Sequence, residues 1–332
     1  MSATLAYSPS AVLFGLPLKS KVVFFRQLAT MIHSGLPVGR GVVTASQAGC
    51  KELGKELAHL IENGSPLSDA MAKYPNHFNK YEIALVRAGE KSGQLDRQLE
   101  ELAKSTEATW RLQQNVSSKM LYPMLIAHSV VILPPLFILV TDGIKAYLTT
   151  VLGILIPVYF LATLFMLGFR FSRQYPGPKR MLDRFLVSLP IFGKPTKYGA
   201  RIRFMQTLGN LVSAGFLPGQ AIPLAAESSN NLWLRDKVII AWRNLGDSAS
   251  MSEVVSKSGA FESFEIGLLV TGEETGSFVS SIQKAAEALI PEYEAQIHRI
   301  SVVLPVIMLL VVGVYVGYTA VTTMTSIFAP VF

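Results

Sequence analysis

Two short glycine-glutamate motifs hold the residues best suited to chemistry. They share the pattern Gly-Glu-x-x-Gly and consist of Gly89, Glu90 and Gly93 in the first copy and Gly272, Glu273 and Gly276 in the second. Paired glycines predict a tight corner between helices, and the glutamate between them can accept hydrogen bonds from free N–H groups at the start of the next helix. We favour a structural corner, with a partner-docking corner as the functional alternative. A catalytic carboxylate is disfavoured, because neither copy has a His, a Cys or a second motif acid at ligand spacing.

The other residues with chemical potential give weaker signals. Gly49 to Lys55 matches the first seven positions of a phosphate-binding loop, but Glu56 stands where Ser or Thr would bind magnesium, and we expect no preceding strand. Four histidines are scattered without the spacing of a metal site, namely His33, His59, His77 and His298. The sequence therefore predicts no catalytic residue, no cofactor and no metal.

Three uncharged or nearly uncharged apolar runs predict membrane-spanning helices. They cover residues 120–140, 146–169 and 301–325, and each reaches the roughly 20 residues that cross a bilayer. Pro123 and Pro305 lie early in the first and third runs. His128 lies inside the first run, where an ionisable residue is a functional candidate. We favour a neutral His128 hydrogen-bonded to another membrane helix.

Composition supports a membrane protein. Only 16% of the 332 residues are charged, against about 25% in an ordinary soluble domain. The net charge of +7 is concentrated partly in a basic juxtamembrane segment, residues 170–200, beside the second apolar run. Because this segment directly follows an apolar run, it is typical of a lipid-facing collar rather than a nucleic-acid surface.

The chain outside these runs has helical periodicity. Residues 19–119 predict a bundle of about six helices with stops at Gly35, Gly64 and Gly89. Ser65-Pro66 predicts a helix start with Ser as the N-cap and Pro as the first helical residue. After Gly93 a long helix is expected to run from Gln94 into the first membrane helix without interruption.

The opening pattern returns later in the chain at an offset of 180 to 184 residues. Phe24, Leu28 and Gly35 recur as Phe204, Leu208 and Gly215, and both glycine-glutamate motifs and both early prolines follow in the same order. This order predicts a duplication, with a second helical-bundle domain over residues 201–300. The fold class is therefore an all-α membrane protein with two homologous cytoplasmic domains and three transmembrane helices.

Basic residues predict the orientation. The flanks on the domain side hold ten Lys or Arg, whereas Lys145 is alone on the other side, so both domains are expected in the cytoplasm. Residues 1–18 are expected to be a loose N-terminal arm, and residues 326–332 an external, periplasmic tail. The ten basic residues are Lys104, Arg111, Lys119, Arg170, Arg173, Lys179, Arg180, Arg184, Lys284 and Arg299.

These features together resemble the inner-membrane platform protein family of type II secretion and type IV pilus systems. The resemblance rests on residues 24–37, 82–95, 121–123, 204–218 and 265–278. It implies a non-enzymatic homo-oligomeric scaffold in the inner membrane. The implied partners are a cytoplasmic assembly ATPase, pilin or pseudopilin subunits, other inner-membrane assembly proteins and the lipid bilayer, but no nucleic acid.

Three questions stay open at the level of sequence. The segment between the first two apolar runs is only Thr141 to Lys145, shorter than the family pattern, so the secretion or pilus branch is not determined. A transporter or channel subunit with cytoplasmic helical domains is the alternative function. An enzyme with a carboxylate site at the glycine-glutamate motifs is a third.

Overall fold

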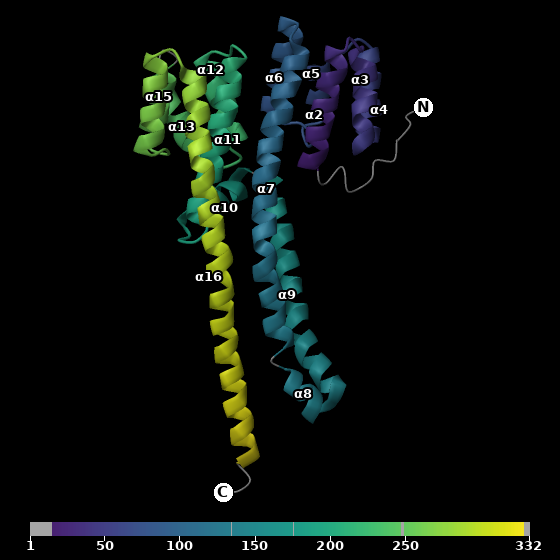
Figure 1. Ribbon diagram of the computed structural model, residues 1–332, viewed down its shortest axis with the longest axis vertical. Coiled ribbons are helices and arrows are strands. Elements are labelled where there is room, and N and C mark those ends of the chain that lie inside the picture. Colours follow the sequence, from purple (N-terminus) through teal and green to yellow (C-terminus); the bar gives the residue numbers. More distant parts are fainter. Residues whose placement is uncertain (1–14, 134, 175, 247–248, 329–332) are drawn as a thin grey trace. The chain divides into compact units, whose positions relative to one another are not determined.

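The computed structural model describes residues 15–133, 135–174, 176–246 and 249–328, and every regular element in them is a helix (Figure 1). The expected N-terminal arm and external tail lie mostly outside these residues. The chain forms two compact units. Unit 1 comprises Met1–Gln114 and Lys197–Pro291, and unit 2 comprises Asn115–Thr196 and Glu292–Phe332.

The first half of unit 1 is a helical bundle. Its apolar helix faces meet in a core where the Phe24 ring centroid lies 5.5 Å from that of Phe25 and 6.2 Å from that of Phe78. Edge and tilted ring pairs of this kind add to the stabilisation from apolar burial. The elements are α2 (Leu18–His33), α3 (Val38–Ala45), η1 (Ser46–Ala48), α4 (Lys51–Glu62), α5 (Leu67–Ala72), α6 (Lys80–Ser92) and the start of α7 (Leu95–Ile132).

The second half of unit 1 repeats this element order. Its elements are α11 (Gly193–Ser213), α12 (Pro218–Ser228), α13 (Leu232–Leu245), α14 (Met251–Ser258), α15 (Ser263–Glu274) and the start of α16 (Phe278–Phe328). Gly35 and Gly215 end α2 and α11 with φ of 81° and 84°. The next residues, Leu36 and Phe216, donate backbone hydrogen bonds of 3.0 Å to carbonyls five residues earlier. Each described half thus contributes the six α-helices expected from the sequence.

Two helix boundaries differ from the expectation. Pro66 is the N-cap of α5 and not its first helical residue. Gly89 does not end α6, which continues to Ser92. Gly93 makes the corner instead, with φ of 70°, as does Gly276 in the second copy. A left-handed residue ends a helix, whereas Gly89 keeps helical hydrogen bonding, so only the second glycine of each motif forms the turn.

Unit 2 contains the predicted apolar runs. Its elements are the rest of α7, α8 (Leu136–Thr141), α9 (Gly143–Gln174), α10 (Pro176–Ser188) and the rest of α16. The prediction of one helix over 120–140 is wrong, because α7 ends at Ile132 and α8 begins at Leu136. Pro135 lacks an N–H and disfavours helix in the residue before it. The basic segment 170–200 is largely helical, and α11 begins eight residues before the predicted start at 201.

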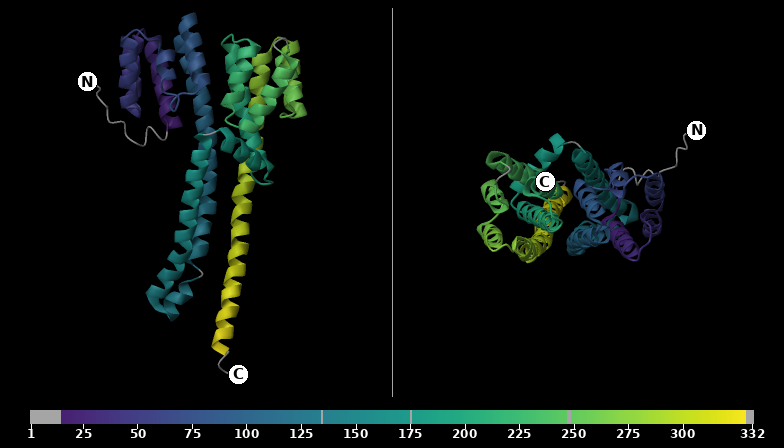
Figure 2. Two further views of the ribbon diagram at one scale, coloured as in Figure 1. Left: turned by 180° about the vertical axis from the view of Figure 1, so that it is seen from behind. Right: turned by 90° about the horizontal axis from the view of Figure 1, so that it is seen from above.

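Among the described residues, the stretch Gly143–Leu164 is long and apolar enough to cross a membrane. Almost none of its residues are buried by the rest of the chain. The three membrane helices expected from the sequence are therefore not confirmed. α7 and α16 each continue from unit 1 into unit 2 as single helices. Figure 1 shows α16 as one unbroken ribbon, and Figure 2 shows its C-terminal part from behind.

Candidate functional site

The second glycine-glutamate motif places its carboxylate at the start of α14. Glu273 accepts hydrogen bonds from the backbone N–H of Met251 at 2.9 Å and of Ser252 at 3.1 Å, and from the Ser252 hydroxyl. These N–H groups have no helical partner of their own, so the carboxylate caps the helix. The sequence expectation was correct about the kind of donor. It was wrong about the helix, because α14 precedes the motif by about twenty residues.

The first motif repeats this arrangement with fewer contacts. The backbone N–H of Ser68, in the first turn of α5, lies 3.3 Å and 3.4 Å from the two carboxylate oxygens of Glu90. Ser68 and Ser252 occupy equivalent positions in the two repeats. We name these two arrangements the Glu90 cap and the Glu273 cap.

The environment of Glu273 favours the ionised form. Partial burial alone would raise its pKa, but the hydrogen bonds from Ser252 and Met251 outweigh burial, so the pKa lies below its usual value. An ionised carboxylate accepts hydrogen bonds and donates none, and here both oxygens are occupied. This geometry stabilises a helix start and is unlike a carboxyl group poised for proton transfer near neutral pH.

The first glycine of each motif permits close helix packing. A Cβ atom at Gly89 would lie 2.9 Å from the Cα of Leu95 in α7. At Gly272 it would overlap the side chain of Ser281 and lie 3.2 Å from the Cα of Phe278 in α16. Glycine is thus needed here for space, whereas Gly93 and Gly276 are needed for their backbone conformation.

Two buried ion pairs, one in each repeat, were not predicted from the sequence. In the first repeat, the Lys21 ammonium lies 2.9 Å from both carboxylate oxygens of Glu82, which also accepts from the Asn79 N–H at 2.9 Å. In the second, Arg201 lies 3.3 Å from Glu265. The bases are 180 residues apart and the acids 183, so the repeat itself carried this signal.

The two ion pairs have different surroundings. Arg201 also donates to the Ala260 carbonyl at 2.7 Å and to Glu262 at 2.7 Å. Burial raises the pKa of Glu265, and the charge of Arg201 partly opposes that rise. Arg201 therefore favours the ionised form of a carboxylate whose burial favours the neutral form.

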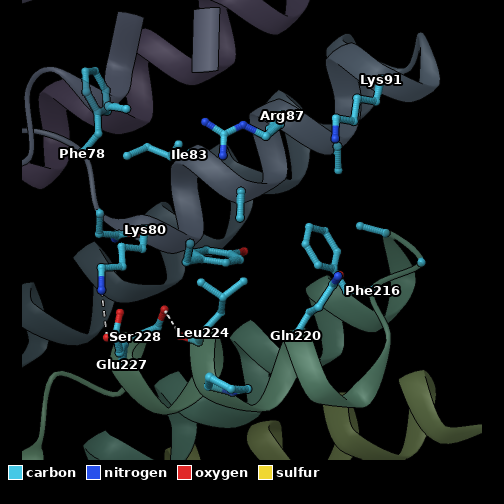
Figure 3. Close-up of a pocket in the computed structure, with 18 of the residues that line it drawn as sticks. Phe78, Lys80, Ile83, Arg87, Lys91, Phe216, Gln220, Leu224, Glu227 and Ser228 are labelled. Atoms are coloured by element: carbon cyan, nitrogen blue, oxygen red, sulfur yellow. Dashed lines mark hydrogen bonds and ion pairs between the residues drawn. The ribbon is translucent and has the colours of Figure 1, made fainter. Parts of the chain in front are cut away.

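A groove of about 1140 Å³ within unit 1 joins the two repeats along α6 and α12 (Figure 3). The Tyr81 hydroxyl accepts from the Asn210 amide at 2.9 Å, and the Lys80 ammonium lies 3.1 Å from Glu227. Burial raises the pKa of Tyr81 to about 12, so its phenol stays neutral. The walls also carry Arg87, Lys91, Phe216, Gln220 and Leu224.

The remaining candidates fall in unit 2 or are dispersed. His128 in α7 contacts the Tyr159 hydroxyl of α9 through Nε2, and its Nδ1 lies 2.7 Å from the Met124 carbonyl oxygen. The bond to another helix agrees with the expectation, whereas the neutral state of His128 and the membrane location of both helices stay predictions. Pro123 and Pro305 lie inside α7 and α16, which continue past them. In the described part of the chain, no three His, Cys, Asp or Glu gather as a metal site.

Comparison with known proteins identifies a matching family and several similar proteins. The family described as type II secretion system (T2SS), protein F matches residues 24–141 and again residues 204–325. The matches begin 180 residues apart and end 184 apart, which confirms the duplication and its offset. The resemblance stated from the sequence is confirmed as well.

Three relatives match nearly the whole chain. A type IV pilus assembly protein PilC from Myxococcus xanthus is 26% identical over 90% of this chain and 78% of its own length. A PilC from Thermus thermophilus is 26% identical over 90% of this chain and 80% of its own. A type II secretion system protein F from Vibrio cholerae is 23% identical over the same two shares, 90% and 80%.

Proposed function

Because the chain belongs to the type II secretion system protein F family, we propose that it is a non-enzymatic platform of a type II secretion or type IV pilus machine in the inner membrane. The doubled family match supports this role most directly. The platform couples a cytoplasmic assembly ATPase to the insertion of pilin or pseudopilin subunits into a filament, beside other inner-membrane assembly proteins.

The proposal places three segments in the bilayer, with both helical bundles in the cytoplasm. They are residues 120–140, which span the break between α7 and α8, and residues 146–169 and 301–325. The exposed apolar stretch Gly143–Leu164 supports this placement, because a soluble protein would cover such a surface. Exposed Phe160 and Leu161 in α9 and Leu310 in α16 fit contact with lipid chains.

In this platform, the caps and the buried ion pairs would keep the helical bundles folded under mechanical force. They fix helix starts and buried charges inside the bundles, and they leave the exposed surfaces free for partners. In this proposal the two glycine-glutamate motifs keep each bundle folded while the ATPase acts on it.

A deletion strain tests the role. Loss of the chain should abolish secreted-protein release or surface filaments, and the affected process identifies the branch. The tagged full chain should co-purify with the assembly ATPase from detergent extracts, whereas an unrelated tagged inner-membrane protein should not.

Two outcomes would replace the proposal. Solute flux through the purified chain in liposomes, with normal secretion and filaments in the deletion strain, would favour the transporter alternative. ATP hydrolysis by the purified chain alone, lost in Glu90→Gln and Glu273→Gln, would favour an enzyme.

A further inference from the structure

The contact between α6 and α12 joins two different surfaces of a duplicated bundle. α6 belongs to the first repeat and α12 to the second. Lys80 of α6 pairs with Glu227 of α12, and Tyr81 of α6 accepts a hydrogen bond from Asn210 of α11. The counterpart of α6 is α15, and the counterpart of α12 is α3. The contact uses α6 and α12 and so occurs once within the chain. The corresponding face of α15 and the corresponding face of α3 are therefore left without an equivalent partner.

The α15 face is exposed in the chain. Residues of α15 follow those of α6 by 183 positions, as Gly89 and Gly272 show, so Phe264 corresponds to Tyr81. Tyr81 is 6% exposed in its contact, whereas Phe264 is 60% exposed. Val270 is also exposed, and a Cβ at Gly267 would meet nothing within 4 Å. An uncovered aromatic next to an open glycine makes an apolar face that another helix can approach closely.

The α3 face offers a matching surface. Residues of α12 follow those of α3 by 180 positions, so Leu36 corresponds to Phe216 and Arg40 to Gln220. Arg40 is exposed, and Leu36 and Val43 are half-exposed. This face therefore combines two partly open aliphatic side chains with one cation.

Charge makes the two faces complementary. Lys91 and Gln220 line the same groove, and their counterparts are Glu274 on α15 and Arg40 on α3. α15 has acidic and no basic residues, whereas α3 has Arg40 and no acid. Within the described residues, neither the Arg40 guanidinium nor the Glu274 carboxylate has an ion-pair partner (compare Lys91 and Gln220 in Figure 3).

We propose that α15 of one copy packs on α3 of a second copy of this chain, as α6 packs on α12 within the chain. The contact covers Phe264 and pairs Glu274 with Arg40. The contact joins unlike surfaces, and two copies related by a two-fold axis make it twice, so that the two contacts together form one isologous interface. It rests on the repeat and its contacts alone, so it stands or fails separately from the transport role.

Crosslinking of full-length chains tests the geometry. Two differently tagged chains, both Cys50→Ser, are co-expressed with Arg40→Cys in one and Glu274→Cys in the other. Treatment with a short bismaleimide should give a dimer that carries both tags. A chain with Lys55→Cys, exposed on α4, replaces the Arg40→Cys chain as the control and should give little product.

Two crosslinking results would overturn the proposal. One is mixed-tag product no greater than that of the Lys55 control. The other is efficient dimer formation between two Glu274→Cys chains, since α15 would then meet α15 and not α3.

Charge exchange tests the pairing independently of crosslinking. Arg40→Glu and Glu274→Arg should each weaken self-association by up to about fivefold, and the double variant should recover it. Phe264→Ala should weaken it by at least about tenfold, because a covered aromatic anchors an interface. Unchanged self-association in all four variants would refute the contact. Protease resistance of each variant checks folding, which exposed positions should leave intact.

Discussion

At the residue scale, the two Gly-Glu-x-x-Gly motifs differ in the number of hydrogen bonds that their glutamates accept. The Glu273 cap holds two N–H groups and a hydroxyl, whereas the Glu90 cap holds one N–H at longer distance. Ser252 supplies its hydroxyl as well as its N–H, which the structure does not show for Ser68. The carboxylates are thus equivalent in position and unequal in hydrogen bonding.

This difference predicts unequal losses of stability. Glu273→Ala should lower the free energy of unfolding by about 1.5–3 kcal/mol, and Glu90→Ala by about 1 kcal/mol or less. Denaturant titration of the purified chain and its membrane abundance both report the effect. Full abundance and normal ATPase binding of both variants, with assembly abolished, would instead revive a chemical role for the carboxylates.

The Glu273 cap also predicts an acid-side pH dependence. Because the folded pKa lies below the unfolded value, the stabilisation is present above the unfolded pKa and is lost as pH falls through the folded one. The wild type should therefore lose stability on acidification more steeply than Glu273→Gln.

The buried ion pair of the second repeat predicts a larger effect with the opposite pH sign. Arg201→Met leaves Glu265 buried without its cation and should cost about 3–5 kcal/mol. The raised pKa of Glu265 rises further in this variant, so protonation restores part of the stability as pH falls. Thermal unfolding at pH 5.5 and 7.5 should show a smaller deficit at the lower pH. An equal deficit at both values would mean that Glu265 is not the cause.

At the element scale, the missing side chain at Gly272 sets how closely α15 meets α16. Gly272→Ala should cost about 1–3 kcal/mol, because the Cβ would overlap Ser281 and Phe278 would have to move. Gly267→Ala is the matched control on the same helix. Its Cβ meets nothing in the chain, so it should be neutral or slightly stabilising. Similar losses from both would show that helix propensity, and not packing, explains the glycine.

Local signals explain which elements could be predicted from the sequence. The helix ends at Gly35 and Gly215 can be predicted from the glycines themselves. The continuity of α7 can be predicted from the helical spacing of its apolar residues. The missed features depend on tertiary contacts: Gly89 reads as a stop until α7 is seen against it, and Lys21 is 61 residues from Glu82. Pro135 is a local signal for a helix break, but the continuous apolar run 120–140 favours a single helix and hides that signal.

At the scale of the whole molecule, the duplication decides the topology that we expect. In a Cys50→Ser background, single cysteines at Ser105, Ser188 and Ser326 are labelled on intact cells with an impermeant reagent. Burial raises the pKa of the native Cys50 thiol to about 11, so even unreplaced it reacts slowly. Ser326→Cys should be labelled from outside, and the other two only after lysis.

Labelling at Ser188 but not at Ser326 would reverse the orientation. Labelling at both would mean that an even number of membrane crossings separates them. Either result leaves the duplication intact, because the doubled family match does not depend on the side of the membrane.

The uninterrupted passage of α7 and α16 between the two units has a mechanical consequence. An α-helix turns by about 100° per residue, so one residue inserted into either helix rotates the residues after it by about 100°. α16 alone has 51 residues, which corresponds to about 75 Å of continuous helix. A twist applied at one end of such a shaft reaches the other, whereas a flexible linker would dissipate it.

Alanine insertions can separate the effect of rotating the two helices from the effect of lengthening them. One alanine after Gln114 and one after Pro291 shift the phase by about 100° and should abolish filament or secreted-protein yield at normal abundance. Seven alanines at each site lengthen both helices by about 10 Å but restore the phase to within roughly 20°, and should recover part of the yield. If yield instead falls steadily with the number of inserted residues, then length matters and the two helices do not act as torsional shafts.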